Sequence, residues 1–282
     1  MVSTWLITGC STGLGRALAQ AVLDRGHHVV VTARDVERVQ DLADAHPDTA
    51  IAVALNVTDH QQVTQAVQAA RERFGNIDVL VNNAGYGYRA AVEEGDERDV
   101  QRLFATNVFG AVAMIKAVLP GMRERRSGAI VNISSIGARI TPAGSGYYAA
   151  TKAALEGLTG SLRKELEPLG ITAMVVEPGG FRTDFSGRSL QQSADPIADY
   201  ADTAGRRRKE HDRTHGTQAG DPAKAANAII DVVGSDTPPA LLLLGEDALT
   251  AFRRVLDAER AELDAWEHVS LATAVDAAAR DD

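Results

Sequence analysis

The stretch Trp5-Leu6-Ile7-Thr8-Gly9-Cys10-Ser11-Thr12-Gly13-Leu14-Gly15-Arg16 joins a short apolar run to a helical pattern through three glycines. Because glycine has no Cβ, the backbone at these positions can turn sharply and approach a ligand closely. The first turn of the following helix offers unpaired N–H groups and the positive end of the helix dipole, which suit a pyrophosphate. The stretch therefore predicts a strand–turn–helix unit that binds a dinucleotide. The alternative is a tight turn without a ligand, since the spacing G-x-x-x-G-x-G differs from the common G-x-G-x-x-G pattern.

Outward from this unit, short apolar runs rich in Val and Ile alternate with longer helical patterns. None of the runs shows clean polar alternation, which is typical of strands buried on both faces. The strand candidates are residues 5–8, 28–33, 50–55, 78–82, 129–134, 172–177 and 240–244. The helical patterns cover residues 14–25, 36–45, 61–74, 97–125, 146–169, 223–233 and 248–266. This alternation predicts an α/β fold with one doubly wound parallel sheet of about seven strands and helices on both faces.

Length and composition indicate a soluble globular protein. The chain has 282 residues, of which 45% are apolar and 24% charged, and no repeat or linker divides it, so we expect a single domain over residues 1–282. With 29 basic and 38 acidic residues the net charge is −9, which argues against nucleic-acid or anionic-membrane binding. The single cysteine, Cys10, cannot form an internal disulfide and is interpreted as a small loop residue. No signal peptide and no apolar run of ~20 residues is apparent, so we expect a cytoplasmic protein.

Residues 184–220 break the pattern, because they are polar and lack a sustained hydrophobic period. A loop of this length is typical of a lid, a binding loop or a disordered segment, and we interpret it as a substrate lid. It contains the basic run Arg206–Lys209, followed by Arg213. This run either belongs to a solvated helix or attracts an anionic substrate or a phosphopantetheine carrier. Asp221 and Pro222 suit the N-cap and first position of a helix. Residues 246–282 are expected to form a C-terminal helix and a tail that frays over 276–282.

The end of the second strand decides which dinucleotide is bound. An acidic residue there would accept hydrogen bonds from the ribose 2′-OH, whereas this strand ends in Ala33 followed by Arg34. The small Ala33 leaves room, and the guanidinium of Arg34 suits a 2′-phosphate. The sequence therefore predicts NADP(H) in preference to NAD(H). In the alternative interpretation Arg34 is solvated and Asp35 is the ribose acid.

Tyr148 and Lys152 lie four residues apart in an Ala-rich helical pattern, so their side chains project from one face. A phenol titrates at about 10, and a neighbouring ammonium favours the phenolate and lowers that pKa. The pair could therefore exchange a proton near neutral pH. On its own the spacing also occurs by chance in many helices. Tyr147 is a competitor, but it has no lysine four residues further on.

Together these motifs resemble the short-chain dehydrogenase/reductase family over roughly residues 3–245. The family's motifs occur in order: T-G-x-x-x-G-x-G at residues 8–15, Asn82-Asn83-Ala84-Gly85 after the fourth strand, Asn107 inside a helix, Ser135 at the end of the fifth strand, Tyr148 with Lys152, and P-G-x-x-x-T at residues 178–183. The resemblance implies a Rossmann-type sheet with strand order 3-2-1-4-5-6-7. It also implies an oxidoreductase that interconverts a ketone or aldehyde and an alcohol by hydride transfer with NADP(H), without a metal.

The resemblance implies a role for each residue of the catalytic set. Tyr148 would donate or accept the proton, and Lys152 would hold the nicotinamide ribose and lower the tyrosine pKa. Ser135 would hydrogen-bond the substrate oxygen, with the neighbouring Ser134 as its competitor. Asn107 would support a proton relay through water to the lysine, unless it is only a buried structural residue.

The cofactor contacts follow from the same resemblance. Asn83 would pack near the adenosine ribose, and Thr183 would hold the carboxamide. The family often has Asp where this chain has Asn56, whose amide can still bind adenine. The expected cofactor-binding residues are Gly9, Ser11, Thr12, Gly13, Leu14, Gly15, Arg34, Asn56, Val57, Asn83, Ala84, Gly85, Tyr148, Lys152, Pro178, Gly179, Phe181 and Thr183.

The substrate is expected to be a small carbonyl or alcohol compound. Candidate pocket walls are Tyr86, Tyr88, Arg89, residues 137–144 and the lid. Similarity to hydroxysteroid- and retinol-type members implies a bulky hydrophobic substrate. The alternatives are a cofactor-sensing regulator, which should lack the Ser/Tyr/Lys set, and a non-redox member with a longer substrate domain. The family's dimer face is formed by the helices at 97–125 and 146–169, so we expect a homo-oligomer, with a dimer favoured over a tetramer.

Overall fold

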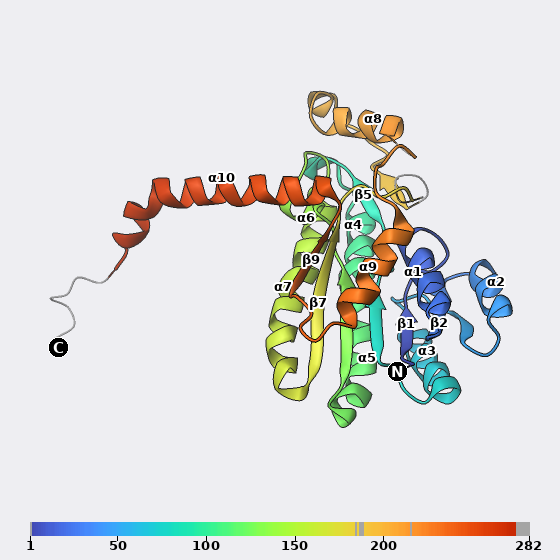
Figure 1. Ribbon diagram of the computed structural model, residues 1–282. Helices are drawn as coiled ribbons and strands as arrows, with labels where there is room; N and C mark the ends of the chain where they lie inside the picture. The colour runs from blue at the N-terminus through green and yellow to red at the C-terminus, as the bar shows by residue number, and fades with distance from the viewer. Residues whose placement is uncertain (1, 184, 186–188, 215, 275–282) are drawn as a thin grey trace, which may run out of the picture.

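The computed structural model describes residues 2–183, 185, 189–214 and 216–274. Its centre is a parallel sheet of seven strands in the order β3-β2-β1-β4-β6-β7-β9 (Figure 1). These strands are β1 (Thr4–Ile7), β2 (His28–Ala33), β3 (Ala50–Ala54), β4 (Val79–Asn82), β6 (Gly128–Ile133), β7 (Ile171–Pro178) and β9 (Leu241–Leu244). The expected order 3-2-1-4-5-6-7 is confirmed, because β6, β7 and β9 are the last three strands of this sheet along the chain.

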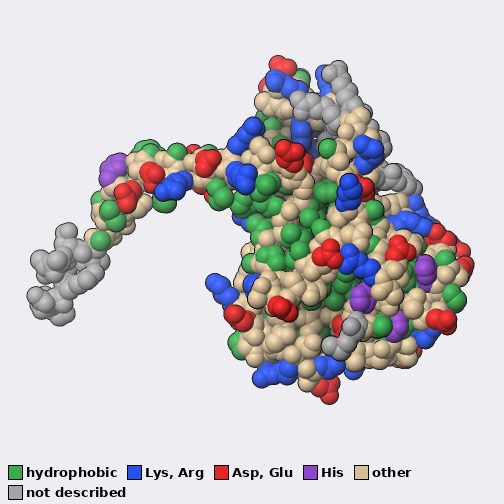
Figure 2. Space-filling model, in the orientation of Figure 1, with side chains coloured by type: hydrophobic (Ala, Val, Ile, Leu, Met, Phe, Trp, Pro, Cys, Tyr) green, Lys and Arg blue, Asp and Glu red, His purple; other side chains and the backbone are tan. Residues whose placement is uncertain are grey.

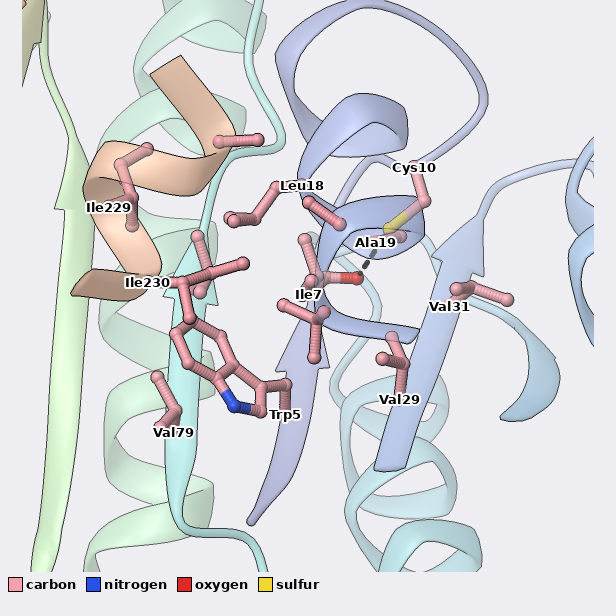
Figure 3. Close-up of a cluster of buried hydrophobic side chains, with 14 of the residues drawn as sticks. Trp5, Ile7, Cys10, Leu18, Ala19, Val29, Val31, Val79, Ile229 and Ile230 are labelled. Atoms are coloured by element: carbon pink, nitrogen blue, oxygen red, sulfur yellow. Dashed lines mark hydrogen bonds between the residues drawn. The ribbon is translucent and has the colours of Figure 1, made fainter. Parts of the chain in front are cut away.

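Helices cover both faces of the sheet because successive strand residues point into two separate cores. Trp5 and Ile7 point to one side, where Leu18 and Ile229 pack against them (Figure 3). Leu6, between them, belongs to the core on the other side. The first side holds α1 (Gly13–Asp24), α2 (Glu37–Ala45) and α9 (Pro222–Val233). The second side holds α3 (His60–Phe74), α5 (Ala111–Arg125) and α7 (Gly146–Leu166).

The segment predicted as one helix over 97–125 is divided in the structure. It consists of α4 (Glu97–Phe104), a π-helical turn (Ala105–Gly110) and α5. Such turns are rare and occur frequently at functional sites. By composition the segment is apolar enough to pass as a membrane span, with a mean hydropathy of 1.6 in its most apolar window. Met114 and Met122 are fully buried in the second core, so this apolar character is that of a core helix.

The lid contains more regular structure than its sequence pattern predicts. The strand β8 (Leu190–Gln192) pairs in parallel with β5 (Gly87–Arg89), which follows β4. The helix α8 (Ala204–Thr214) stands beyond the end of the sheet at which the strands terminate (Figure 1). Three-residue strands are too short to display a period in sequence, so the pairing could not be predicted. Residues 184, 186–188 and 215 of the expected lid lie outside the described residues.

The C-terminal helix α10 (Glu246–Leu271) extends away from the sheet and is longer than the predicted 248–266 (Figure 1). Hydrophobic side chains gather where it leaves the rest of the molecule (Figure 2). Further along it, Leu263 and Trp266 are exposed. The tail expected to fray over 276–282 lies outside the described residues.

Candidate active site

The carboxyl ends of the parallel strands open into a cavity of about 770 Å³. Its walls come from the segments that follow β1, β2, β4, β6 and β7, together with lid residues. Open α/β sheets bind their ligands at this edge. Of the site residues predicted from sequence, all line the cavity except Gly15 and Asn107.

The glycine loop between β1 and α1 has backbone conformations that other residues rarely adopt. Gly9 and Gly13 have φ of +75° and +63°, in the left-handed region. A Cβ on Gly15 would lie 2.3 Å from Nδ2 of Asn83 and 2.5 Å from the carbonyl oxygen of Gly9, so glycine is required there. The Asn83 amide donates to the carbonyl oxygens of Thr8 and Gly9 at 2.9 and 3.0 Å. The loop thus forms a bare backbone surface at the start of α1, which fits a pyrophosphate.

Asn83 therefore has a structural task that the resemblance did not imply. Its side chain fastens the glycine loop to the end of β4, although the residue also lines the cavity near the expected adenosine ribose. The backbone N–H groups of Asn83 and Ala84 both donate to Oγ1 of Thr8, at 3.0 and 2.9 Å. These four hydrogen bonds hold the loop rigid, so the surface offered to a dinucleotide is formed in advance.

Side chains that follow β2 and β4 form the wall of the cavity beside the glycine loop. Ala33 and Arg34 line the cavity, whereas Asp35 does not. Arg102 of α4 lines it as well. Burial raises the pKa of Tyr86, whereas the charges of Arg102 and Arg34 both act to lower it. Sequence reasoning missed Arg102, because an arginine on an amphipathic helix gives no signal distinct from a solvated residue.

Tyr148 and Ser135 meet where β6 ends and α7 begins. Tyr148 is 7% exposed, and it is hydrogen-bonded with Ser135. The Gly137 N–H donates to Oγ of Ser135 at 3.0 Å, which orients the serine hydroxyl. Phe185 of the lid covers the phenol, with ring centroids 5.8 Å apart. Two hydroxyl groups held in a place shielded from water can stabilise negative charge that develops on a substrate oxygen.

Lys152 lies one helical turn after Tyr148, with its ammonium 5.8 Å from the phenol ring centroid. Its Nζ donates to the carbonyl oxygen of Ile133 at 2.7 Å, and the side chain is buried. Burial lowers the pKa of Lys152 to about 8, although Glu156 acts to raise it. The lysine therefore changes its charge close to neutral pH.

The pKa of Tyr148 is raised in this structure, whereas a neighbouring ammonium alone would lower it. Burial has the largest influence and raises the pKa of Tyr148, while the Ser135 hydrogen bond and the Arg89 charge act to lower it. Helical spacing places the two side chains on one face, but the ammonium is held at the Ile133 carbonyl and both groups are removed from water. Arg89, whose charge acts to lower the pKa of the phenol, belongs to β5.

The competing residues have other partners. Ser134 donates its hydroxyl to Oε1 of Glu156 at 2.6 Å, and the Tyr147 hydroxyl donates to the carbonyl oxygen of Val92 at 2.6 Å. The structure thus brings Ser135 and Tyr148 together and directs both competitors elsewhere.

Asn107 lies in the π-helical turn and is fully engaged there. Its Nδ2 donates to the Tyr86 carbonyl oxygen at 2.9 Å and to Oγ1 of Thr151 at 3.1 Å, while its Oδ1 accepts from the Tyr86 N–H at 3.1 Å. This is the structural role that the sequence left open as an alternative. A Cβ on Gly85 would come 3.0 Å from Oδ1 of Asn107 and 3.6 Å from Nζ of Lys152, so the two polar atoms flank one glycine.

A charge cluster around the buried Glu177 supports the segment that follows Ser135. Glu177 of β7 has no solvent exposure, and Nε of Arg139 donates to its Oε1 at 3.1 Å. Arg139 belongs to the short helix α6 (Gly137–Ile140) and also pairs with Glu156 at 2.8 Å. Burial, followed by the nearby Glu156, raises the pKa of Glu177 to about 7. The cluster therefore joins the segment after Ser135 to α7 and to the end of β7.

The raised pKa of Glu177 predicts a pH-dependent stability. At pH 5 the folded state keeps this carboxyl protonated, and at pH 8 it must hold a buried carboxylate, so stability falls as the pH rises from about 4.5, the ordinary pKa of the carboxyl, to about 7. Glu177→Gln removes the titration. Relative to the unaltered protein, the variant should gain about 2 kcal/mol in the free energy of unfolding between pH 5 and pH 8. Urea unfolding at both pH values measures this difference. The exposed Glu167→Gln is the control, and an equal stability difference at both pH values would refute the prediction.

Comparisons with known proteins agree with this geometry. A family model described as short chain dehydrogenase matches residues 3–194. Oxidoreductase BOA17 of Botryotinia fuckeliana is 39% identical over 277 residues, which cover 97% of this chain and 100% of that protein. The 3-ketodihydrosphingosine reductase of Bacteroides thetaiotaomicron is 37% identical over 241 residues, which cover 83% of this chain and 84% of that protein. The chain therefore belongs to the short-chain dehydrogenase/reductase family.

Solved structures extend the comparison to the cofactor. A short-chain dehydrogenase from Streptomyces avermitilis has a TM-score of 0.91 and 43% identity, covering 97% of this chain and 98% of that one. ElxO, solved with NADP, has a TM-score of 0.72 and 27% identity, covering 89% and 100%. A 3-ketoacyl-(acyl-carrier-protein) reductase from Brucella melitensis, solved with NADH, has a TM-score of 0.71 and 26% identity, covering 86% and 96%. This protein is an NAD(P)-dependent oxidoreductase that acts on CH–OH and C=O groups.

Proposed function

We propose that this protein interconverts a ketone or aldehyde and the corresponding alcohol with NADP(H), and that Tyr148 is its general acid/base. The observation that carries the proposal is that Ser135, Tyr148 and Lys152 line the same cavity as Gly9 and Gly13 of the glycine loop. The dinucleotide, when bound, supplies or accepts the hydride. The side chains of this protein then bind the substrate oxygen, stabilise its charge and move its proton.

The two hydroxyl groups at the cavity wall, those of Ser135 and Tyr148, bind the substrate oxygen and move its proton. Reduction builds negative charge on the carbonyl oxygen, and Ser135 and Tyr148 stabilise that charge by donating hydrogen bonds to it. Tyr148 then transfers its proton to the oxygen, and in oxidation it takes the proton back. Burial raises the pKa of Tyr148 and so keeps the proton on the phenol at neutral pH, which suits reduction.

The surrounding residues hold the cofactor and connect the phenol to solvent. We propose that Lys152 binds the nicotinamide ribose hydroxyls, that Asn107 supports a relay through water to this lysine, and that Thr183 holds the carboxamide. Support for the relay comes from Gly85, which Oδ1 of Asn107 and Nζ of Lys152 flank. Thr183 lines the cavity and lies against the glycine loop, 3.4 Å from the place of a Cβ on Gly13.

NADPH oxidation in the presence of a panel of ketones and aldehydes tests the function directly. Turnover of one of these carbonyl compounds supports the proposal. A cofactor-sensing regulator would bind NADPH without turning over any of them, and an epimerase or dehydratase would convert its substrate without net oxidation of NADPH. The set of Ser135, Tyr148 and Lys152 at the cavity wall favours the redox reaction over both alternatives.

Replacement of Arg34 by Ala tests the preference for NADP(H). Hydrogen bonds from a guanidinium to a phosphate are charge-assisted, so kcat/KM for NADPH should fall about 10- to 100-fold while kcat/KM for NADH stays unchanged. Steady-state kinetics measure kcat/KM for NADPH and kcat/KM for NADH.

The matched control for this prediction is Arg38→Ala, which removes an exposed arginine of α2 outside the cavity. It should leave both ratios unchanged. An unaltered preference for NADPH over NADH in the Arg34 variant would disprove the cofactor proposal.

The remaining proposals concern the substrate, assembly and location of the protein. Ile140, Pro142 and Phe185 line the cavity, which supports a hydrophobic substrate body. Phe109 and Leu158 are exposed on the two helical segments expected to form a dimer face, which supports a homodimer. The single, buried Cys10 fits a reducing compartment, and we propose that the protein works in the cytoplasm as one domain over residues 1–282.

A further inference from the structure

Glu94 is a buried carboxylate outside the central sheet. It ends a short turn (Val92–Glu94) that follows β5, and its side chain has no solvent exposure. Its Oε2 accepts from the Ala91 N–H at 2.7 Å and pairs with Arg208, while its Oε1 accepts from the Ile197 N–H at 2.8 Å. A buried carboxylate is costly unless it is paired and hydrogen-bonded, so the partners of Glu94 show which segments it joins.

The lid supplies three contacts to Glu94. Besides Ile197 and Arg208, Ser193 belongs to the lid, and its hydroxyl donates to the Glu94 carbonyl oxygen at 2.6 Å. Among the residues of α8 whose side chains the structure describes, Ala204 alone is buried. Apolar packing therefore anchors α8 at its start, and Glu94 holds it further along, at Arg208.

The lid also forms the wall of the cavity beside the phenol. Phe185 packs against Tyr148, and Leu190 of β8 pairs with Gly87 of β5. A Cβ on Gly87 would lie 2.7 Å from the Leu190 side chain and 3.3 Å from that of Phe185, so both lid side chains rest on this glycine. The position of the lid on β5 thus decides how closely Phe185 covers the phenol.

A cover at this place acts on the substrate rather than on the dinucleotide. The glycine loop is fastened by Asn83 and Thr8, which follow β4 and β1, away from the contacts of Glu94. Phe185, by contrast, lines the cavity at the reacting end. Closing a lid over a site excludes water and holds the substrate in the geometry of the reaction.

We propose that Glu94 is a positioning residue, which holds the lid against β5 so that Phe185 covers the substrate beside Tyr148. Glu94 does not line the cavity, so it acts through its lid contacts. This deepens the function proposed above and rests on it for the reaction, but the state of the lid can be measured without turnover. The competing explanation is that Glu94 stabilises only its own turn, through the Ala91 N–H.

Limited proteolysis measures the lid directly, because trypsin cleaves at basic residues and α8 contains the run Arg206–Lys209. Glu94→Gln keeps the size of the side chain but removes the charge that Arg208 pairs with, so cleavage in this run should become about 10-fold faster. Glu97→Gln, at an exposed position of α4, is the matched control and should leave the rate unchanged. Equal rates in Glu94→Gln and the unaltered protein would overturn the proposal.

Arg208→Gln distinguishes the two explanations and serves if Glu94→Gln does not fold. It removes the pair from the lid side and leaves the contact between Glu94 and Ala91 in place. Cleavage at the remaining basic residues of the run should therefore become about 10-fold faster in this variant too. An unchanged rate would show that Glu94 serves only its own turn.

Kinetics with two ketones show whether the position of the lid matters to the reaction. Acetophenone has an aromatic ring for Phe185 to cover, whereas acetone has none, so in Arg208→Gln the KM for acetophenone should rise about 10-fold. The KM for acetone and the Kd for NADPH should both stay within about twofold. An equal rise for both ketones indicates a general loss of structure and contradicts the proposal. If no carbonyl compound is turned over, the proposed function fails, and proteolysis still decides whether Glu94 holds the lid.

Discussion

Turnover is expected to fall about 1,000-fold or more when Tyr148 is replaced by Phe. The substitution keeps the ring, which packs against Phe185, and removes the hydroxyl that hydrogen-bonds with Ser135. General acid–base catalysis by a positioned side chain contributes about 10²- to 10⁴-fold, and this hydroxyl also stabilises the developing charge. Because the change removes one oxygen from a cavity of about 770 Å³, the affinity for NADPH should stay within about threefold. Steady-state kcat and fluorescence titration with NADPH measure the two quantities.

Tyr147→Phe is the matched control for this prediction. It removes a hydroxyl from the neighbouring residue, but that hydroxyl donates to the Val92 carbonyl and takes no part in the site. Its turnover should remain close to that of the unaltered protein. The assignment of Tyr148 fails if Tyr148→Phe keeps more than about a tenth of the original kcat, because loss of the group that transfers the proton should lower kcat by at least about 100-fold.

The second large effect is expected for Lys152→Met, which should lower kcat/KM about 100-fold. Methionine fills a similar volume but cannot donate the hydrogen bonds of the ammonium, and each hydrogen bond from a charged group contributes about 1.5–3 kcal/mol. The effect should have a pH signature as well. In the unaltered protein the ammonium is lost above a pKa of about 8, so kcat/KM should fall as the pH rises through that value.

The pH profile distinguishes this role from a loss of packing. Burial raises the pKa of Tyr148, so the phenol does not account for a decline near pH 8. Lys152→Met should therefore have a profile without that decline, whereas Lys164→Met, at an exposed position of the same helix, should keep it. A decline that persists in the Lys152 variant would assign the titration to another group. NADPH affinity measured alongside reports whether the lysine also holds the cofactor.

Local patterns were sufficient to predict the sheet. Runs such as His28–Ala33 are apolar throughout because their residues face two cores, and their alternation with amphipathic helices leaves few topologies. The π-helical turn at Ala105–Gly110 and the pairing of β5 with β8 were not predicted. Both depend on contacts between distant segments. The turn is held by Asn107 against Tyr86, and Gly87 of β5 pairs with Leu190 across about a hundred residues of chain.

In the candidate site, too, some features could be predicted from the sequence and others depend on contacts between distant segments. The glycine spacing predicted a phosphate loop, but only the structure shows that the Asn83 amide leaves no room for a Cβ on Gly15. The basic lid run allowed two interpretations. The structure pairs Arg208 with Glu94 and places Arg207 at the cavity, so one residue of the run fastens the lid and its neighbour faces the site.

By itself, the sequence determined the parallel α/β sheet and the family of the protein, and through the resemblance it predicted the strand order and the candidate site residues, because these follow from local periodicity and from residue types at short spacings. The tertiary structure decided the electrostatics of that chemistry. Tyr148 and Lys152 lie four residues apart, yet burial sets the pKa of each, and the cation that acts on the phenol is Arg89, from a strand 59 positions earlier in the chain. Desolvation and charge depend on every segment that packs around a group, whereas a spacing of four residues describes the contacts within one helix only.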